Sequence, residues 1–151
     1  LWDRYGASHS AKFIAVPFEG VVAEIMRSVS HRHWGVVLKR QMLVAAAEIA
    51  RKNNAIGLVT GDAVAQVSSQ TLSNLNVVDR ATDEVVLRPL VSMDKESIIR
   101  IAREIGTESN ARTMPEYCGA LSRNPATRAN PPRVHSLAAP TDAPAPGTGS
   151  V

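Results

Sequence analysis

Residues 55–75, AIGLVTGDAVAQVSSQTLSNL, join a short apolar run to a glycine turn and a stretch that can form a helix. The apolar run stops at Thr60 and Gly61, and residues 63–75 are compatible with a helix. Strand, glycine turn and helix form the unit from which parallel α/β sheets are built. Because ligands gather at the carboxyl ends of such strands, this stretch predicts an α/β fold with a candidate ligand site around Gly61.

On the N-terminal side, the spacing of apolar residues predicts a short strand and two helices. Residues 12–18, KFIAVPF, have the β-branched and aromatic side chains of a strand, which Pro17 confines to an end or an edge. Residues 19–30 and 35–54 repeat apolar positions at three and four, as helices with one buried face do. The expected buried positions are Val22, Ile25, Met26, Val29, Leu38, Met42, Ala45, Ala46 and Ile49.

On the C-terminal side, residues 85–91, VVLRPLV, form a second extended run that Pro89 limits. A helix is expected to follow, with Asp94 as its N-cap and Gly106 just after its last turn. Its expected buried positions are Ile98, Ile101, Ala102 and Ile105.

The composition changes after Leu121. Residues 122–151 hold six of the nine prolines and no aromatic residue, so we expect a disordered tail behind an incomplete domain at residues 1–121. The chain carries a formal charge of +3, of which the tail contributes three Arg against one Asp. The nearly neutral remainder has no strong electrostatic footprint for nucleic acid, so phosphate contacts to any RNA must come mostly from elsewhere.

The chain has one cysteine and no run of about 18 apolar residues. We therefore expect a cytoplasmic protein with no membrane span and no internal disulfide. His31 and His33 lie two residues apart without further ligands nearby, so no metal site is expected from them.

Five positions are candidates for a ligand site, each with a plainer alternative. Lys95 lies in the first turn of its helix, where it opposes the helix dipole unless an anion binds, although its position alone favours a solvated lysine. Gly61 and Gln70 could approach a nucleotide, but most glycine turns only connect elements. Lys39 and Arg40 could reach a phosphate, or they could mark the solvated face of their helix.

Cys118 lies between Pro115 and Gly119, in a context that breaks regular structure. An arbitrary cytosolic cysteine most often fills a gap in the core. On an exposed turn, however, a thiol can attack a sulfur held by another group. The local sequence leaves both roles open.

The chain resembles the tRNA uridine 4-sulfurtransferases, also called tRNA 4-thiouridine synthetases. Four blocks carry the resemblance in their order and spacing: GVVLKRQM, LVTGDAVAQVSSQTLSNL, VLRPLVSMDKESIIRIAREIGT and ARTMPEYCGALSRNP. The similarity runs from Leu1 to about Pro125. It implies an α/β fold of the PP-loop type, which is adenine nucleotide α-hydrolase-like, with helices flanking a partial parallel sheet.

The resemblance also implies an activity. The family uses ATP, with Mg²⁺ expected, to adenylate O4 of uridine 8 in tRNA, and a persulfide sulfur then replaces that oxygen to give 4-thiouridine. The sulfur comes from a cysteine desulfurase by way of a rhodanese-like domain, and it also supplies the thiazole of thiamine. By residue, the resemblance assigns Lys95 to adenylation, Cys118 to a disulfide with the rhodanese-like domain, and Arg40, Gly61 and Gln70 to the nucleotide.

The chain departs from the family at several points. Asp62 and Ala65 stand where the family usually has Glu and Gly, and an SGGxDS phosphate loop, a THUMP region and a rhodanese-like domain are missing from the sequence. We therefore expect a fragment of the parent enzyme that is inactive by itself. The alternative is a non-catalytic truncation product or a protein-binding module.

Overall fold

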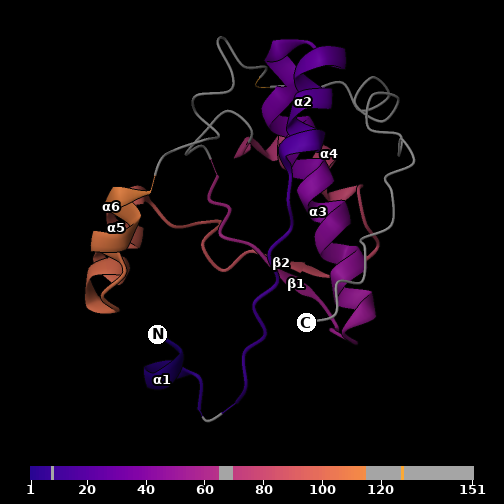
Figure 1. The fold of residues 1–151 in the computed structure, drawn as a ribbon. Coiled ribbons are helices and arrows are strands. Elements are labelled where there is room, and N and C mark those ends of the chain that lie inside the picture. The colour runs from indigo at the N-terminus through magenta and orange to yellow at the C-terminus, as the bar shows by residue number, and fades with distance from the viewer. Residues whose placement is uncertain (8, 65–69, 115–126, 128–151) are drawn as a thin grey trace.

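The computed structural model describes residues 1–7, 9–64, 70–114 and 127. None of the helices in these ranges combines the length and the apolar composition needed to cross a bilayer. Nine elements are described (Figure 1): α1 Trp2–Tyr5, α2 Glu19–Ser28, η1 His31–His33, α3 Trp34–Lys52, β1 Leu58–Val59, α4 Leu72–Asp79, β2 Val86–Leu87, α5 Lys95–Glu104 and α6 Glu108–Thr113.

The two strands are parallel neighbours, with Leu58 opposite Val86 and Val59 opposite Leu87. The strands lie within the extended runs expected at residues 55–62 and 85–91 and confirm them in part, since residues 89–91 form a turn. The strand expected at residues 12–18 is wrong, because no strand is assigned there and Phe13 is 94% exposed. Apolar and β-branched composition favours a strand only where a neighbouring strand accepts its hydrogen bonds.

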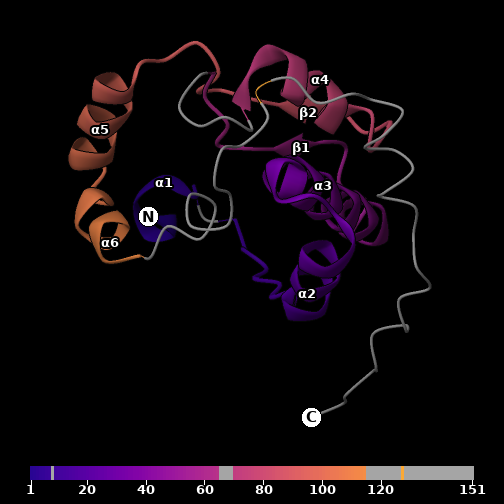
Figure 2. The same ribbon diagram turned by 90° about the horizontal axis from the view of Figure 1, so that it is seen from above.

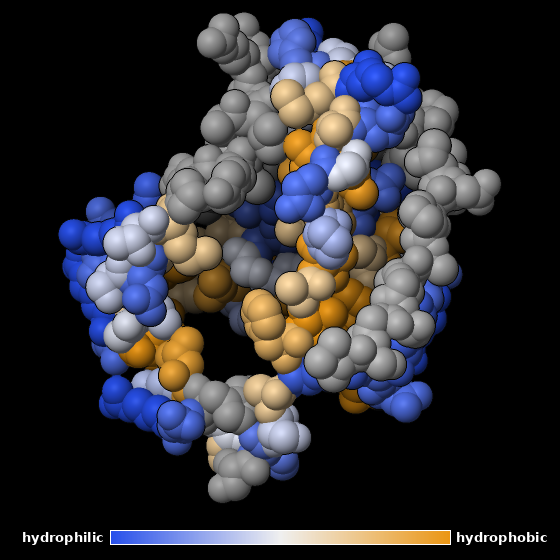
Figure 3. Space-filling view, in the orientation of Figure 1, coloured by the Kyte–Doolittle hydropathy of each residue, from blue (hydrophilic) through white to orange (hydrophobic). Residues whose placement is uncertain are grey.

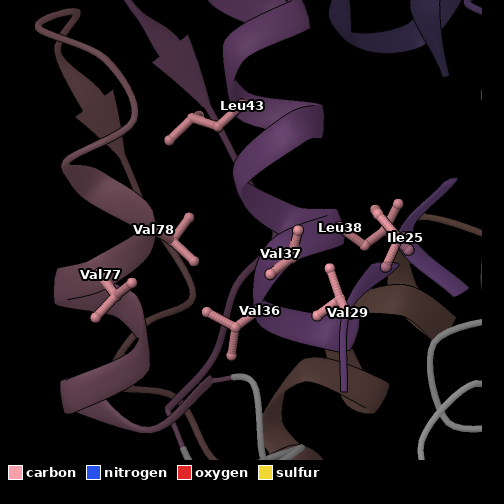
Figure 4. Close-up of a cluster of buried hydrophobic side chains, with 8 residues drawn as sticks. All are labelled: Ile25, Val29, Val36, Val37, Leu38, Leu43, Val77 and Val78. Carbon is pink, nitrogen blue, oxygen red and sulfur yellow. The ribbon is translucent and has the colours of Figure 1, made fainter. Parts of the chain in front are cut away.

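The helix α3 is the centre of the structure. It lies between α2 and the strands (Figure 2), and it also packs against α4. One cluster of buried side chains joins these helices (Figure 4): Ile25, Val29, Val36, Val37, Leu38, Leu43, Val77 and Val78. Burial of this apolar surface is the main force that holds the helices together.

The predicted helices at 19–30 and 35–54 are confirmed, but their buried faces are only partly as expected. Ile25, Val29 and Leu38 are buried, whereas Met26 and Met42 are about half exposed at 48% and 51%. Because α3 packs against partners on two sides, which of its residues are buried depends on the position of those partners. The sequence of α3 alone does not reveal that position.

The helix expected within residues 63–75 begins later than expected, at Leu72. Thr71 caps it, since the Thr71 side chain accepts a hydrogen bond from the Asn74 backbone N–H at 3.2 Å. Residues 63 and 64 are not helical, and residues 65–69 lie outside the described part.

The caps of α5 are as predicted. The Asp94 carboxylate accepts a hydrogen bond from the Ser97 backbone N–H at 2.8 Å. Gly106 adopts a left-handed φ of +80°, and the Thr107 N–H donates to the Ala102 carbonyl at 2.8 Å, which closes a Schellman motif.

The expected burial of the α5 apolar face is confirmed only in part, because the four expected positions are half-buried and no residue of α5 is fully buried. Within the described residues α5 packs mainly against α6, and the two helices form an arm beside the body of α2, α3, α4 and the strands (Figure 1). In the space-filling view, open space separates this arm from the α3 side of the molecule (Figure 3). The tail proposed for residues 122–151 lies outside the described part except for Thr127, and the domain limit at 121 stays a prediction.

Candidate active site

The carboxyl ends of β1 and β2 lie at the same edge, because the strands are parallel. The backbones stay side by side beyond the strands. The Thr60 N–H donates to the Leu87 carbonyl at 3.0 Å, and the Val64 N–H donates to the Val91 carbonyl at 3.1 Å. This edge is where α/β sheets gather ligands, and it holds the Thr60–Gly61 turn.

Asp62 is the centre of a polar network at this edge, and it is only 7% exposed. The Lys39 ammonium and the Gln70 amide nitrogen donate to Asp62 Oδ1, the latter at 3.1 Å. On the other oxygen, Thr60 Oγ1 donates to Oδ2 at 2.8 Å, and Arg88 Nε lies 3.4 Å from it. Donors from α3, from both strand ends and from the segment before α4 therefore converge on one carboxylate, which we call the Asp62 cluster.

The pKa of Asp62 is lowered from its ordinary value. Burial alone raises this pKa, but the hydrogen bonds from Lys39, Thr60 and Gln70, together with the positive charge of Lys39, outweigh burial. Asp62 is therefore an anion at neutral pH, and it can only accept hydrogen bonds.

Arg88 extends the cluster to the end of α4. Its guanidinium donates to both oxygens of Asp79, with Nη1 3.3 Å from Oδ2. Two cations, Lys39 and Arg88, thus face two carboxylates, Asp62 and Asp79, so the four charges balance. The cluster orients polar groups, and it leaves no excess charge for a phosphate.

Arg40, the neighbour of Lys39, lies in the packing between α3 and α4. Only 6% of Arg40 is exposed, and its Nη1 donates to the Val77 carbonyl in the last turn of α4. Burial lowers the pKa of Arg40, although arginine stays charged in proteins. Arg40 thereby supplies a partner to one of the carbonyls that a helix end leaves free.

We expect Arg40→Met to lower the free energy of unfolding by about 1–3 kcal/mol, because the Val77 carbonyl would lose its charged hydrogen-bond donor. Arg51→Met is the matched control on the same helix, since the Arg51 side chain is 59% exposed; its expected effect is within about 0.5 kcal/mol. Urea denaturation measures both. Equal effects for the two variants would contradict a structural role for Arg40.

Gly61 lies beside the cluster in a position that does not itself demand glycine. A Cβ built on Gly61 meets no atom within 4 Å, and its φ is not in the left-handed region. At Gly57, by contrast, a Cβ would lie 3.1 Å from the Val85 carbonyl oxygen, so a side chain there would push against the backbone of the neighbouring strand. The backbone of Gly61 is therefore open to close approach by a ligand.

Lys95 and Arg40, both expected at the site, are not part of the Asp62 cluster. Lys95 is the first residue of α5, exposed on the arm, and it forms no hydrogen bond or ion pair with another described residue. Cys118 lies outside the described residues, as does Ala65. Of the expected residues, the structure thus brings Gly61 and Gln70 together at the strand ends.

The sequence analysis missed Asp62 as the centre of the site and Lys39 as its partner. Helical spacing contained a signal, because Val36, Leu43 and Ala47 lie four before, three after and seven after Arg40. That pattern places Arg40 on the buried face of α3, so Lys39 points elsewhere. No group of three or more metal-binding side chains gathers in the described part of the chain.

The chain was compared with known protein families and structures. The model of the family described as thiamine biosynthesis protein (ThiI) matches residues 1–141. The chain belongs to the ThiI family. The match includes residues beyond Pro125, where the sequence analysis placed the end of the resemblance.

Curated relatives of this ThiI chain are named tRNA sulfurtransferase. The protein from Marinobacter nauticus is 77% identical over 134 residues, which make up 89% of this chain and 28% of that protein. The protein from Shewanella piezotolerans is 57% identical over 129 residues, 85% of this chain and 27% of the relative. The chain therefore spans less than a third of the length of these relatives.

Among solved structures, a 4-thiouridine synthetase in complex with RNA and bound ATP matches with a TM-score of 0.72 and 30% identity. The match covers 81% of this chain and 32% of the other. It confirms the α/β fold of the partial PP-loop type, with a parallel sheet and flanking helices.

Proposed function

We propose that this chain is the nucleotide-facing, C-terminal part of the PP-loop domain of a tRNA sulfurtransferase that forms 4-thiouridine. The observation that carries the proposal is the Asp62 cluster at the shared carboxyl edge of β1 and β2, in a chain 77% identical to a tRNA sulfurtransferase. The structural match to a 4-thiouridine synthetase crystallised with RNA and ATP supports ATP and tRNA as its ligands.

The reaction has two steps. O4 of uridine 8 attacks the α-phosphorus of ATP and pyrophosphate leaves, so that a poor leaving oxygen becomes part of AMP. The terminal sulfur of a persulfide then attacks C4, and AMP leaves. We propose that Lys95 balances charge on the phosphates in the first step. After the persulfide attack, the transferred sulfur is bonded both to C4 and to the cysteine sulfur of the rhodanese-like domain. We propose that the Cys118 thiolate attacks this cysteine sulfur, so that its bond to the transferred sulfur breaks, 4-thiouridine leaves and a disulfide forms between Cys118 and the rhodanese-like domain.

At the strand ends, we propose that Gly61 and Gln70 line the nucleotide. The assignment of Arg40 to the nucleotide is less well supported by the geometry, since its guanidinium reaches the Val77 carbonyl. Lys39, which donates to Asp62, is the member of the pair that lies at the strand-end edge. Arg40 would then affect nucleotide binding indirectly, because its contact with the Val77 carbonyl holds α3 and α4 in place.

The remaining partners follow from the same proposal. Asp62 already accepts from several donors, so Mg²⁺ would arrive on the phosphates of ATP, whose oxygens are the ligands it prefers. A cysteine desulfurase would supply the persulfide, the parent would also serve thiamine synthesis, and the reaction would take place in the cytoplasm. The second candidate is a non-catalytic product or a protein-binding module, and it is favoured by the balanced charge of the Asp62 cluster, which leaves no excess charge for a phosphate.

A chimaera tests the proposal. The 134 matched residues of this chain replace their counterpart in the Marinobacter nauticus tRNA sulfurtransferase. Because the replaced segment would keep the same strand-end groups, we expect the chimaera to form 4-thiouridine in tRNA with ATP and a persulfide donor, measured by absorbance of the modified base. The isolated chain is the control and should form none. A folded chimaera that yields no 4-thiouridine would favour the binding module.

A further inference from the structure

The side-chain amide of Gln70 has only one chemically sensible orientation. Asp62 is ionised and offers only acceptors, so the Gln70 group that faces its Oδ1 at 3.1 Å must be the NH₂. The opposite orientation would set two acceptor oxygens against each other. Asp62 therefore fixes which edge of the Gln70 amide points away from the cluster.

The edge that points away is the carbonyl oxygen, and it lacks a donor. Gln70 Oε1 is buried and has no hydrogen-bond partner among residues 1–7, 9–64, 70–114 and 127. Buried acceptors in native proteins nearly always have a partner, because an unmade hydrogen bond costs the full desolvation of the group. The residue as a whole is half-buried, so it lies at the border of the structure rather than deep inside.

The neighbouring cationic donors are directed at carboxylates rather than at Gln70. Lys39 donates to Asp62, and Arg88 Nη1 and Nη2 donate to Asp79. Arg88 Nε is buried without a hydrogen bond, but it lies 3.4 Å from Asp62 Oδ2 and makes no hydrogen bond to Gln70 Oε1. The partner of Gln70 Oε1 therefore has to come from outside the cluster. Phosphate oxygens at neutral pH are acceptors and do not qualify, whereas the amino group of a base and the hydroxyls of ribose do.

We propose that Asp62 is a positioning residue that presents Gln70 Oε1 to a hydrogen-bond donor of the bound nucleoside, either the N6 amino group of adenine or a ribose hydroxyl. This inference rests on the proposed nucleotide site. In it the Asp62–Gln70 pair recognises the nucleoside half of ATP, while the phosphates are held elsewhere. The balanced charge of the Asp62 cluster agrees with this division.

The test is calorimetric titration of the full 151-residue chain with four probes. ATP is compared with purine riboside 5′-triphosphate, which lacks the amino group, and with 2′-deoxy-ATP and 3′-deoxy-ATP, which each lack one hydroxyl. We expect one analogue to bind about 2- to 10-fold more weakly than ATP, the effect of one hydrogen bond. Which analogue loses affinity identifies the donor.

Variants then show whether the Asp62–Gln70 pair causes the difference. Gln70→Leu removes the acceptor, and Asp62→Asn allows the Gln70 amide to adopt either orientation. In both variants ATP and the weaker analogue should bind with about equal affinity. Asp62→Glu keeps the carboxylate and should preserve the preference for ATP. Val77→Ala, a core truncation at a residue 1% exposed, controls for lost stability and should also preserve the ratio.

Three outcomes would overturn the inference. Equal binding of all four probes would mean that water or the protein satisfies Gln70 Oε1. A ratio that survives in Gln70→Leu would mean that another group reads the nucleoside. Failure of every probe to bind a folded chain would remove the nucleotide site from this chain and the inference with it, whereas the first two outcomes leave the proposed function standing.

Discussion

Asp62→Ala is expected to lower the free energy of unfolding by about 3–5 kcal/mol, the cost of removing one partner from a buried ionic network. Lys39 and Arg88 would lose their shared carboxylate, and their side chains are only 18% and 11% exposed. Water can restore little of the lost interaction. Urea denaturation of the chain, followed by circular dichroism, measures the change.

Thr60→Val is the matched control, because it removes one hydrogen bond from an uncharged donor to the same carboxylate and leaves both cations paired. Its expected cost is about 1.5–3 kcal/mol, the range for a hydrogen bond to a charged group. If Asp62→Ala costs no more than this control, the cations are not buried against Asp62 in solution, and the cluster is looser than described.

The pH dependence of stability gives a second check on Asp62. Burial raises its pKa, but the hydrogen bonds from Lys39, Thr60 and Gln70 hold it below the ordinary value. Its contribution is therefore complete above the unfolded-state pKa of about 3.9 and is lost as the pH falls through the lower folded-state pKa. The gap in stability between wild type and Asp62→Ala should narrow in that acid range, and a constant gap would contradict the assignment.

Lys95→Ala, introduced into the active chimaera, is expected to slow adenylation of tRNA by about 10²- to 10³-fold, as loss of one group that stabilises transition-state charge does. Lys95 is exposed at the first turn of α5 and has no partner among the described residues, so the fold should tolerate its loss. Release of pyrophosphate from ATP in the presence of tRNA measures this step.

Two variants control the Lys95 result. Arg100→Ala removes an exposed cation from the same helix and should leave adenylation unchanged. Cys118→Ser should abolish multiple turnover while sparing adenylation, because in the proposed reaction the cysteine acts only after adenylation. If Lys95→Ala and Arg100→Ala slow adenylation equally, the effect comes from the charge of the arm in general rather than from Lys95.

The sequence predicted the local features of this chain better than its long-range contacts. The caps at Asp94 and Gly106 depend on neighbours within a few residues, and both are present. The strand at residues 12–18 and the full burial of one face of α5 depended on partners far along the chain. The strand is not present, and the α5 face is only half-buried.

The candidate site shows the same division. Gly61 was identifiable because it ends an apolar run, and Gln70 through the family resemblance. The four donors around Asp62 come from segments separated by up to 49 residues, between Lys39 and Arg88, so only the fold reveals that they meet.

The separate arm of α5 and α6 has a consequence for motion. With no fully buried residue in α5, its amide hydrogens should exchange with solvent through local opening, while those of α3 should exchange only when the whole core unfolds. A ligand that touched both Lys95 on the arm and Gln70 on the body would join these two cooperative units. Part of its binding free energy would then offset the entropy cost of ordering the arm against the body. Slower hydrogen exchange in α5 would therefore report nucleotide binding, although α5 is separate from the Asp62 cluster.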